Sequence, residues 1–189
     1  QELMKKLDIL EAGDCLVLAG SIPGSLPDSI YQDIAAKMAE KKVQIVVDAT
    51  RDLLLNVLPY RPFLIKPNNH ELGEIFQREL RTREEVIPYA QKLREKGAQN
   101  VLVSMAGEGA VLAAADGKIY QAPAPKGELK NGVGAGDSMV AGFLAGWQEE
   151  KDYRHAFRMG VAAGSASAFS EYLAERREVE AVYRRIKEE

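Results

Sequence analysis

The chain has little cysteine and histidine, no excess of positive charge and no long hydrophobic run. One cysteine, Cys15, excludes an internal disulfide and a cysteine-based zinc site, and its apolar surroundings favour a buried side chain over a reactive thiol. The formal net charge of -3 is not the basic excess of a nucleic-acid-binding protein. No apolar run approaches the roughly 20 residues that cross a bilayer, and no export signal is visible. We therefore expect a cytoplasmic protein without a nucleic-acid or membrane partner.

The length and composition favour one folded domain. The 189 residues are 46% hydrophobic and 28% charged, which supports a sizeable core and excludes disorder as the main state. There is no internal repeat, low-complexity stretch or domain linker, so residues 1–189 are predicted to form a single α/β domain. The chain opens with Gln1 inside an amphipathic segment, so we expect that it is cut from a longer protein.

Short apolar runs alternate with longer segments of helical period along the first half of the chain. The runs at 15–19, 44–48, 63–65 and 100–104 predict strands, and the segments at 27–41, 53–58 and 82–96 predict helices. Buried strands joined by helices are typical of a mostly parallel sheet with helices on both faces. The second half predicts a hairpin, 110–114 and 118–121, followed by helices at 135–148, 153–170 and 178–187.

The segment NGVGAGDSMVAG at residues 131–142 is the most informative motif. Its three early glycines let the backbone bend closely, and a helix begins at once, so unpaired N–H groups gather in one small volume and favour an anion. It is not a Walker loop, because no Lys-Ser/Thr pair follows. It is not the dinucleotide fingerprint either, because Asp137 stands in place of the last glycine, which disfavours an oxidoreductase.

Asp137 has two interpretations. Its carboxylate could accept a proton from a hydroxyl that attacks a phosphoryl group held by the neighbouring amides. It could instead be only a charge or cap at the start of the helix, and a lone glycine-rich turn favours this second interpretation. The apolar stripe of the helix that follows, which includes Phe143 and Trp147, indicates a core-facing side.

A second motif, LIKPNNHE, lies where a predicted strand ends. Open α/β sheets bind ligands at the carboxyl ends of their strands. Lys66 can neutralise phosphate there, and Asn68 and Glu71 offer oxygens to Mg²⁺ or its water shell. Equally, Asn68 or Asn69 can cap a helix that has Glu71 in its first turn. His70 has no second histidine or cysteine nearby and is expected to be a surface side chain, and the same holds for His155.

Two further loops follow predicted strands. The segment VSMAGEGA contains Ser104, Gly107 and Gly109, which could line a nucleotide or simply form a tight hairpin. In the loop at residues 20–27, Ser21 and backbone amides could meet a polar substrate. Each motif is weak alone, but all except the glycine-rich turn at Asn131 directly follow a predicted strand, at the end of the sheet where ligands bind.

Taken together and in this order, AGSIPGSLP, IKPNNHELGE, VSMAGEGAVL and NGVGAGDSMVAGF resemble the ribokinase-like (PfkB-type) sugar kinases, most of all their 1-phosphofructokinase and tagatose-6-phosphate kinase branch. The resemblance covers the chain from Gly13 onward. It implies a three-layer sandwich, with ATP and Mg²⁺ as cofactors and a phosphosugar as substrate. It also implies the following roles: Asp137 as base; Gly134, Ala135 and Gly136 as anion hole; Lys66, Ser104, Gly107, Gly109 and Asn131 at the nucleotide; Asn68 and Glu71 at the metal; and Ser21 and Asp137 at the substrate, with Ser21 near the phosphate of the sugar.

The sequence departs from this family in two places. Asn131-Gly132 stands where the family often has Asp-Thr, and roughly the first third or more of such a kinase, with its lid strands and sugar-gripping residues, has no counterpart here. We therefore expect a fold without a lid, and little or no kinase activity from the 189 residues alone.

The reaction that the resemblance implies is phosphorylation of fructose 1-phosphate to the 1,6-bisphosphate. Tagatose 6-phosphate is an alternative substrate, and a non-catalytic nucleotide-binding fragment is an alternative function. A homodimer is an option for the full-length protein.

Overall fold

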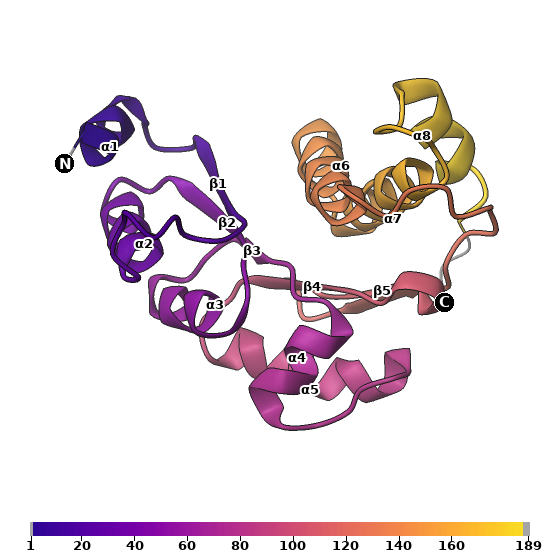
Figure 1. The fold of residues 1–189 in the computed structure, drawn as a ribbon, viewed down its shortest axis with the longest axis horizontal. Helices are drawn as coiled ribbons and strands as arrows, with labels where there is room; N and C mark the ends of the chain where they lie inside the picture. Colours follow the sequence, from indigo (N-terminus) through magenta and orange to yellow (C-terminus); the bar gives the residue numbers. More distant parts are fainter. Residues whose placement is uncertain (1, 187–189) are drawn as a thin grey trace.

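A six-stranded sheet forms the centre of the molecule (Figure 1); the computed structural model describes residues 2–186. The spatial order of the strands is the order of the chain. The first four are parallel and the last two antiparallel: β1 (Cys15–Ala19), β2 (Gln44–Asp48), β3 (Leu64–Ile65), β4 (Asn100–Ser104), β5 (Ala110–Ala113) and β6 (Ile119–Ala122). Every predicted strand is confirmed, although β3 and β5 are each one residue shorter than predicted and β6 begins and ends one residue later.

Eight helices surround this sheet within residues 2–186. They are α1 (Glu2–Lys6), α2 (Ile30–Glu40), α3 (Arg51–Val57), α4 (Asn69–Phe76), α5 (Arg83–Glu95), α6 (Ala135–Glu150), α7 (Tyr153–Ala168) and α8 (Arg176–Tyr183). Short 3₁₀ helices occupy Leu7–Ile9, Leu58–Tyr60 and Ala106–Glu108. The predicted helices are confirmed with shifted ends, and Lys187, the predicted end of the last one, lies outside the described residues. A membrane-spanning helix is absent from the described part of the chain.

The helices form one layer on each face of the sheet, as predicted. Figure 1 shows α6, α7 and α8 on one side and α2 to α5 on the other. Alternate residues of each strand enter the two cores: Val47 and Val101 pack with α2 to α5, whereas Val46 and Leu102 pack with α6 to α8. The three-layer α/β sandwich with a mostly parallel sheet is therefore confirmed.

The strand order explains which helices cover which face. Each parallel connection steps to the next strand in the same direction, and right-handed crossovers then leave all the connecting helices on one face. The other face is covered by the helices that follow the hairpin. Their layer does not reach all of β1, where Val17 remains 42% exposed.

Glycines bring α6 and α7 into close contact. A Cβ built on Gly142 would lie 2.5 Å from the carbonyl oxygen of Met159, and one on Gly164 would lie 3.0 Å from that of Ala135. Gly142 therefore allows the close packing of the two helices. The contact between Gly164 and Ala135 holds the first turn of α6 against α7. The glycine-rich turn before α6 therefore leads directly into a well-packed helix.

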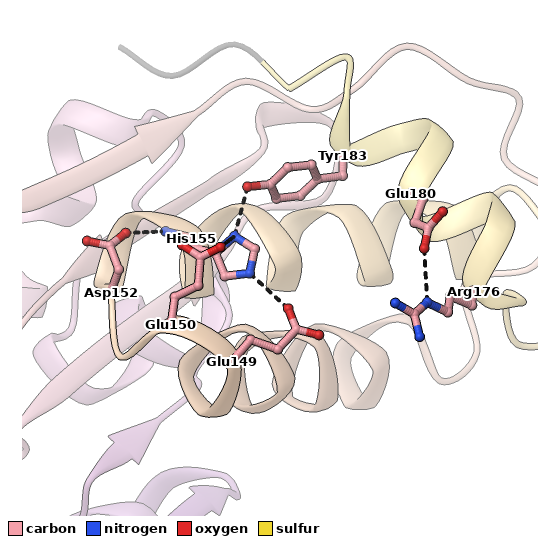
Figure 2. Close-up of polar contacts among 7 residues, drawn as sticks. All are labelled: Glu149, Glu150, Asp152, His155, Arg176, Glu180 and Tyr183. Carbon is pink, nitrogen blue, oxygen red and sulfur yellow. Dashed lines mark hydrogen bonds and ion pairs between the residues drawn. The ribbon is translucent and has the colours of Figure 1, made fainter.

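His155 joins the three helices of this layer, as Figure 2 shows. Its Nδ1 lies 2.9 Å from the Tyr183 hydroxyl of α8, and its Nε2 lies 3.0 Å from Oε2 of Glu149 at the end of α6. The side chain is only 13% exposed. The expectation of a surface side chain is therefore met only in part, because α8 packs over α7 and covers much of the ring.

Candidate active site

The glycine-rich turn before α6 leaves backbone donors free. Gly134 adopts φ +77°, a conformation that favours glycine, and it begins the helix without a side-chain cap. Its carbonyl accepts a hydrogen bond from the N–H of Ser138 at 2.8 Å. Among the described residues, the N–H groups of Gly136 and Asp137 have no backbone acceptor. This start of a 16-residue helix is therefore suited to an anion.

Asp137 lies in the first turn of α6 with an exposed side chain. Among the described residues, no hydrogen-bonding or ion-pairing partner reaches its carboxylate. The side chain therefore does not cap the helix, and that part of the second interpretation is wrong. What it supplies is a free carboxylate beside free N–H groups.

Lys66 reaches the same turn from the sheet. It follows β3, and Asp48 is the last residue of the neighbouring parallel strand β2. The Lys66 Nζ lies 3.2 Å from Oδ1 of Asp48, and the Lys66 side chain is 7% exposed. On its other side the ammonium lies so close to Gly136 that a Cβ there would be 3.2 Å from Nζ. The positive charge is thus held between the sheet and the start of α6.

The charges around this ammonium influence one another. Burial raises the pKa of the Asp48 carboxyl, Lys66 lowers it, and the negative charges of Asp137 and Glu71 raise it further. The net shift is upward, so burial and the two other carboxylates together outweigh the lysine. Three carboxylates and one ammonium therefore act within a single electrostatic neighbourhood.

Asn68 and Glu71 form a capping box at the start of α4. The Asn68 Oδ1 accepts the N–H of Glu71 at 2.8 Å, and the Glu71 Oε2 accepts the N–H of Asn68 at 2.8 Å. The interpretation as a helix cap is therefore confirmed. It leaves the other carboxylate oxygen of Glu71 for a further ligand. One carboxylate with water and phosphate oxygens fits the way Mg²⁺ is held at nucleotide sites, and the metal role stays a prediction.

A cavity of about 660 Å³ lies beside this turn. Several predicted site residues line it, and others do not. The lining includes Asn68, Ser104, Gly107, Gly109, Ala135 and Gly136, whereas Ser21, Lys66, Glu71, Asn131, Gly134 and Asp137 are outside it. An isolated parallel bridge between Asn68 and Ser104 brings the ends of β3 and β4 to the same edge of the cavity. The expected convergence of the strand ends is therefore present for these two motifs.

Sequence reasoning missed one wall of the cavity. Val161, Gly164, Ser165 and Ala168 of α7 line it, together with the stretch 124–127 and Leu129. The run of small residues in VAAGSASA was the available signal, because a helix side without bulky side chains leaves space for a neighbour.

Asn131 and Ser21 have other surroundings. The Asn131 side chain accepts the N–H of Val133 at 3.0 Å and donates to the carbonyl of Glu171 at 3.1 Å, so it ties the glycine-rich turn to the segment after α7. Ser21 is exposed in the loop after β1, next to Gly20, whose N–H donates to the Asp48 carbonyl at 3.0 Å. Their roles toward nucleotide and sugar phosphate stay predictions.

Comparisons with known proteins agree with this arrangement. The "1-phosphofructokinase" of Bacillus subtilis (strain 168) is 49% identical over 170 residues, which are 90% of this chain and 56% of that protein. The "D-tagatose-1-phosphate kinase" of Bacillus licheniformis is 36% identical over 174 residues, 92% of this chain and 57% of that protein. A crystal structure of a Staphylococcus aureus protein assigned as a phosphofructokinase superposes with a TM-score of 0.94 at 37% identity, over 100% of this chain and 61% of that one.

The chain thus spans little more than half the length of the curated relatives that it matches. The match to a protein family is nearly complete from the side of this chain: residues 1–178 match the pfkB family carbohydrate kinases. The glycine-rich turn, the free carboxylate that follows it and the family match lead to the same conclusion. The chain belongs to the pfkB family of carbohydrate kinases.

Proposed function

We propose that the protein containing this chain is an ATP-dependent kinase that transfers a phosphoryl group to a hydroxyl of a phosphorylated ketohexose, with fructose 1-phosphate as the preferred substrate. The observation that carries the proposal is the meeting of free N–H groups, a free carboxylate and a buried ammonium at the start of α6, beside a cavity of about 660 Å³. Phosphoryl transfer needs positioning and charge stabilisation, and this edge of the sheet supplies groups for both.

In the proposed reaction Asp137 accepts the proton of the attacking sugar hydroxyl. The hydroxyl oxygen forms a bond to the terminal phosphorus of ATP, and the bond from that phosphorus to its bridging oxygen breaks, so ADP leaves. The amides of Gly134 and Gly136 and the Lys66 ammonium stabilise the charge that develops on the transferred group. The Ala135 N–H would join them by leaving the Gly132 carbonyl, to which it donates at 3.3 Å.

Mg²⁺ would be held by the free carboxylate oxygen of Glu71, with Asn68 beside it, and it supplies Lewis-acid neutralisation of the phosphate oxygens when bound. Ser104, Gly107 and Gly109, which line the cavity, would border the nucleotide. Asn131 would act there by holding the glycine-rich turn, since its side chain bridges Val133 and Glu171.

Asp137→Asn tests the proposed base. In the full-length enzyme we expect turnover to be abolished while the affinity for ATP stays nearly unchanged, because the amide keeps the shape of the side chain and loses the proton acceptor. The measurement is a coupled kinase assay together with calorimetric titration of ATP. The matched control is Asp152→Asn, which alters the cap of α7 and retains a good capping residue. Retention of most activity by Asp137→Asn would remove Asp137 from this role.

The sugar is identified by a substrate panel. The names of the similar proteins support fructose 1-phosphate and add tagatose 1-phosphate; tagatose 6-phosphate remains in the panel as the alternative expected from the sequence. We expect the highest kcat/KM with fructose 1-phosphate. A clear preference for either tagatose phosphate would overturn this choice and leave the kinase proposal standing.

The 189-residue chain and the longest protein that its gene encodes are assayed side by side. We expect little or no turnover by the 189 residues, because they match little more than half of each kinase compared above. Turnover by the longer protein would support the kinase proposal. Nucleotide binding without turnover by either would favour a non-catalytic nucleotide-binding protein. A homodimer stays a prediction, and light scattering on the longer protein tests it.

A further inference from the structure

Lys66 carries a charge that needs a fixed partner. A lysine ammonium lies at the end of a flexible stem, so it has no defined position unless another group holds it. Only 7% of this side chain is exposed, and a buried charge without a partner is strongly unfavourable. Within the described part of the chain, the ion pair of Lys66 is with Asp48, at 3.2 Å.

The three nearby carboxylates have different tasks. One oxygen of Glu71 is held in the capping box of α4, and the other is assigned to the proposed metal. Asp137 is exposed and has no partner among the described residues, as a proton acceptor requires. Asp48 is half-buried and faces the ammonium. Because Asp48 satisfies Lys66, the lysine is not drawn onto Asp137, where an ion pair would block the proposed base.

The backbone on both sides of this pair is hydrogen-bonded to neighbouring strands. Asp48 pairs with Ala19 in the sheet, and its carbonyl accepts the N–H of Gly20 at 3.0 Å. The Lys66 N–H donates to the carbonyl of Val47 at 3.1 Å. Groups placed on adjacent strand ends hold their geometry better than groups placed on loops.

Resting on the function proposed above, we propose that Asp48 is a positioning residue: its carboxylate holds the Lys66 ammonium beside Gly136 at the start of α6, so that the lysine charge faces the transferred phosphoryl group and Asp137 stays free. Asp48 acts through Lys66 and does not itself touch the reacting atoms.

A double-mutant cycle tests this role in the full-length kinase. Lys66→Met is expected to lower kcat about 10²-fold or more, as the loss of a transition-state donor does. Asp48→Asn is expected to lower kcat about ten- to hundredfold with little change in the KM for the sugar phosphate, because the lysine is then misplaced. In the Lys66→Met background, Asp48→Asn should add less than about twofold, since its target is gone. Equal effects in both backgrounds would overturn the proposal.

A second measurement does not depend on turnover. Mild acylation of lysines, read by mass spectrometry on the 189-residue chain, should label Lys66 several-fold faster in Asp48→Asn than in the unsubstituted chain. The matched control is Asp116→Asn, which removes one carboxylate at the β5–β6 hairpin, where Asp116 accepts hydrogen bonds from Tyr120 and Lys118. This control should leave both Lys66 labelling and kcat unchanged. Unchanged labelling in Asp48→Asn would contradict the proposal.

The two proposals fail in different ways. No turnover by the unsubstituted full-length protein on any sugar of the panel contradicts the kinase function, and the labelling result still decides whether Asp48 holds Lys66. Normal turnover with additive effects of the two substitutions, together with a raised Mg²⁺ requirement in Asp48→Asn, would assign Asp48 to the cation and overturn the positioning role.

Discussion

At the scale of single residues, Gly136 at the start of α6 leaves little room between the helix and the Lys66 side chain from the sheet. Its φ is not in the left-handed region, so alanine fits the backbone, but the added Cβ would come within 3.2 Å of the Lys66 Nζ. We expect Gly136→Ala to lower kcat about tenfold or more by displacing the ammonium. Stability to urea should not fall, because alanine is favoured over glycine in helices by up to about 1 kcal/mol.

The control for Gly136→Ala is Gly24→Ala, which adds the same methyl group where nothing lies within 4 Å. Its kcat and its urea midpoint should both match those of the unsubstituted protein. If Gly136→Ala kept full turnover, the position of Lys66 beside Gly136 would have no bearing on catalysis.

Part of the site could be predicted from its residues, and part could not. The glycine-rich turn and Asp137 are local, since the glycines, the carboxylate and the start of the helix follow one another directly. The place of Lys66 against Gly136 depends on a contact between residues far apart in the chain. The sequence identifies Asp48 only as the end of a predicted strand. Its ion pair with Lys66 depends on the sheet order, which places β2 beside β3.

At the scale of elements, α6 and α7 pack so closely that the contact between them has no room for an added methyl group at Gly142. A Cβ on Gly142 would meet the Met159 carbonyl at 2.5 Å and the Ala163 methyl at 2.6 Å, and backbone cannot move aside as a side chain can. We expect Gly142→Ala to lower the free energy of unfolding by about 1–3 kcal/mol, as overpacking does. Urea denaturation measures the change. Ala145→Ser, on the exposed side of α6, should stay within about 0.5 kcal/mol.

If Gly142→Ala unfolded at the same urea concentration as the unsubstituted protein, the two helices would have room to separate without loss. The support that α7 gives to the first turn of α6 would then be weaker than the packing indicates.

The helices and strands differed in how well the sequence predicted them. Strands such as β2 and β4 were predicted to the residue, because apolar runs bounded by turn residues have few alternatives. For α4 the sequence predicted only the cap at its start. It did not predict that residues of α7 line the cavity. A helix pattern tells which side is apolar, but not which of its small residues face a cavity.

At the scale of the whole molecule, the edge strand β1 has an apolar side chain that the helices leave partly exposed. Cys15 packs against the core under α6 to α8, and alternation along β1 puts Val17 on the same face, where it is 42% exposed at an edge strand. We expect the 189-residue chain to self-associate through this edge at high concentration and Val17→Lys to reduce that association. Sedimentation velocity measures it, with Gln148→Lys as a control for added charge. Equal association of both variants would contradict the expectation.

The strand order also has a consequence for synthesis. One face of the sheet receives its helices as the strands are made, whereas the other waits for α6 to α8, which follow the last strand. At about 5–20 residues per second, a ribosome needs roughly 3–13 s to pass from the end of β4 to the end of α7. During this interval Val46, Leu64 and Leu102 lack the helices α6 to α8, against which they pack in the folded chain. We therefore expect a nascent chain of this kind to bind chaperones at the ribosomal exit.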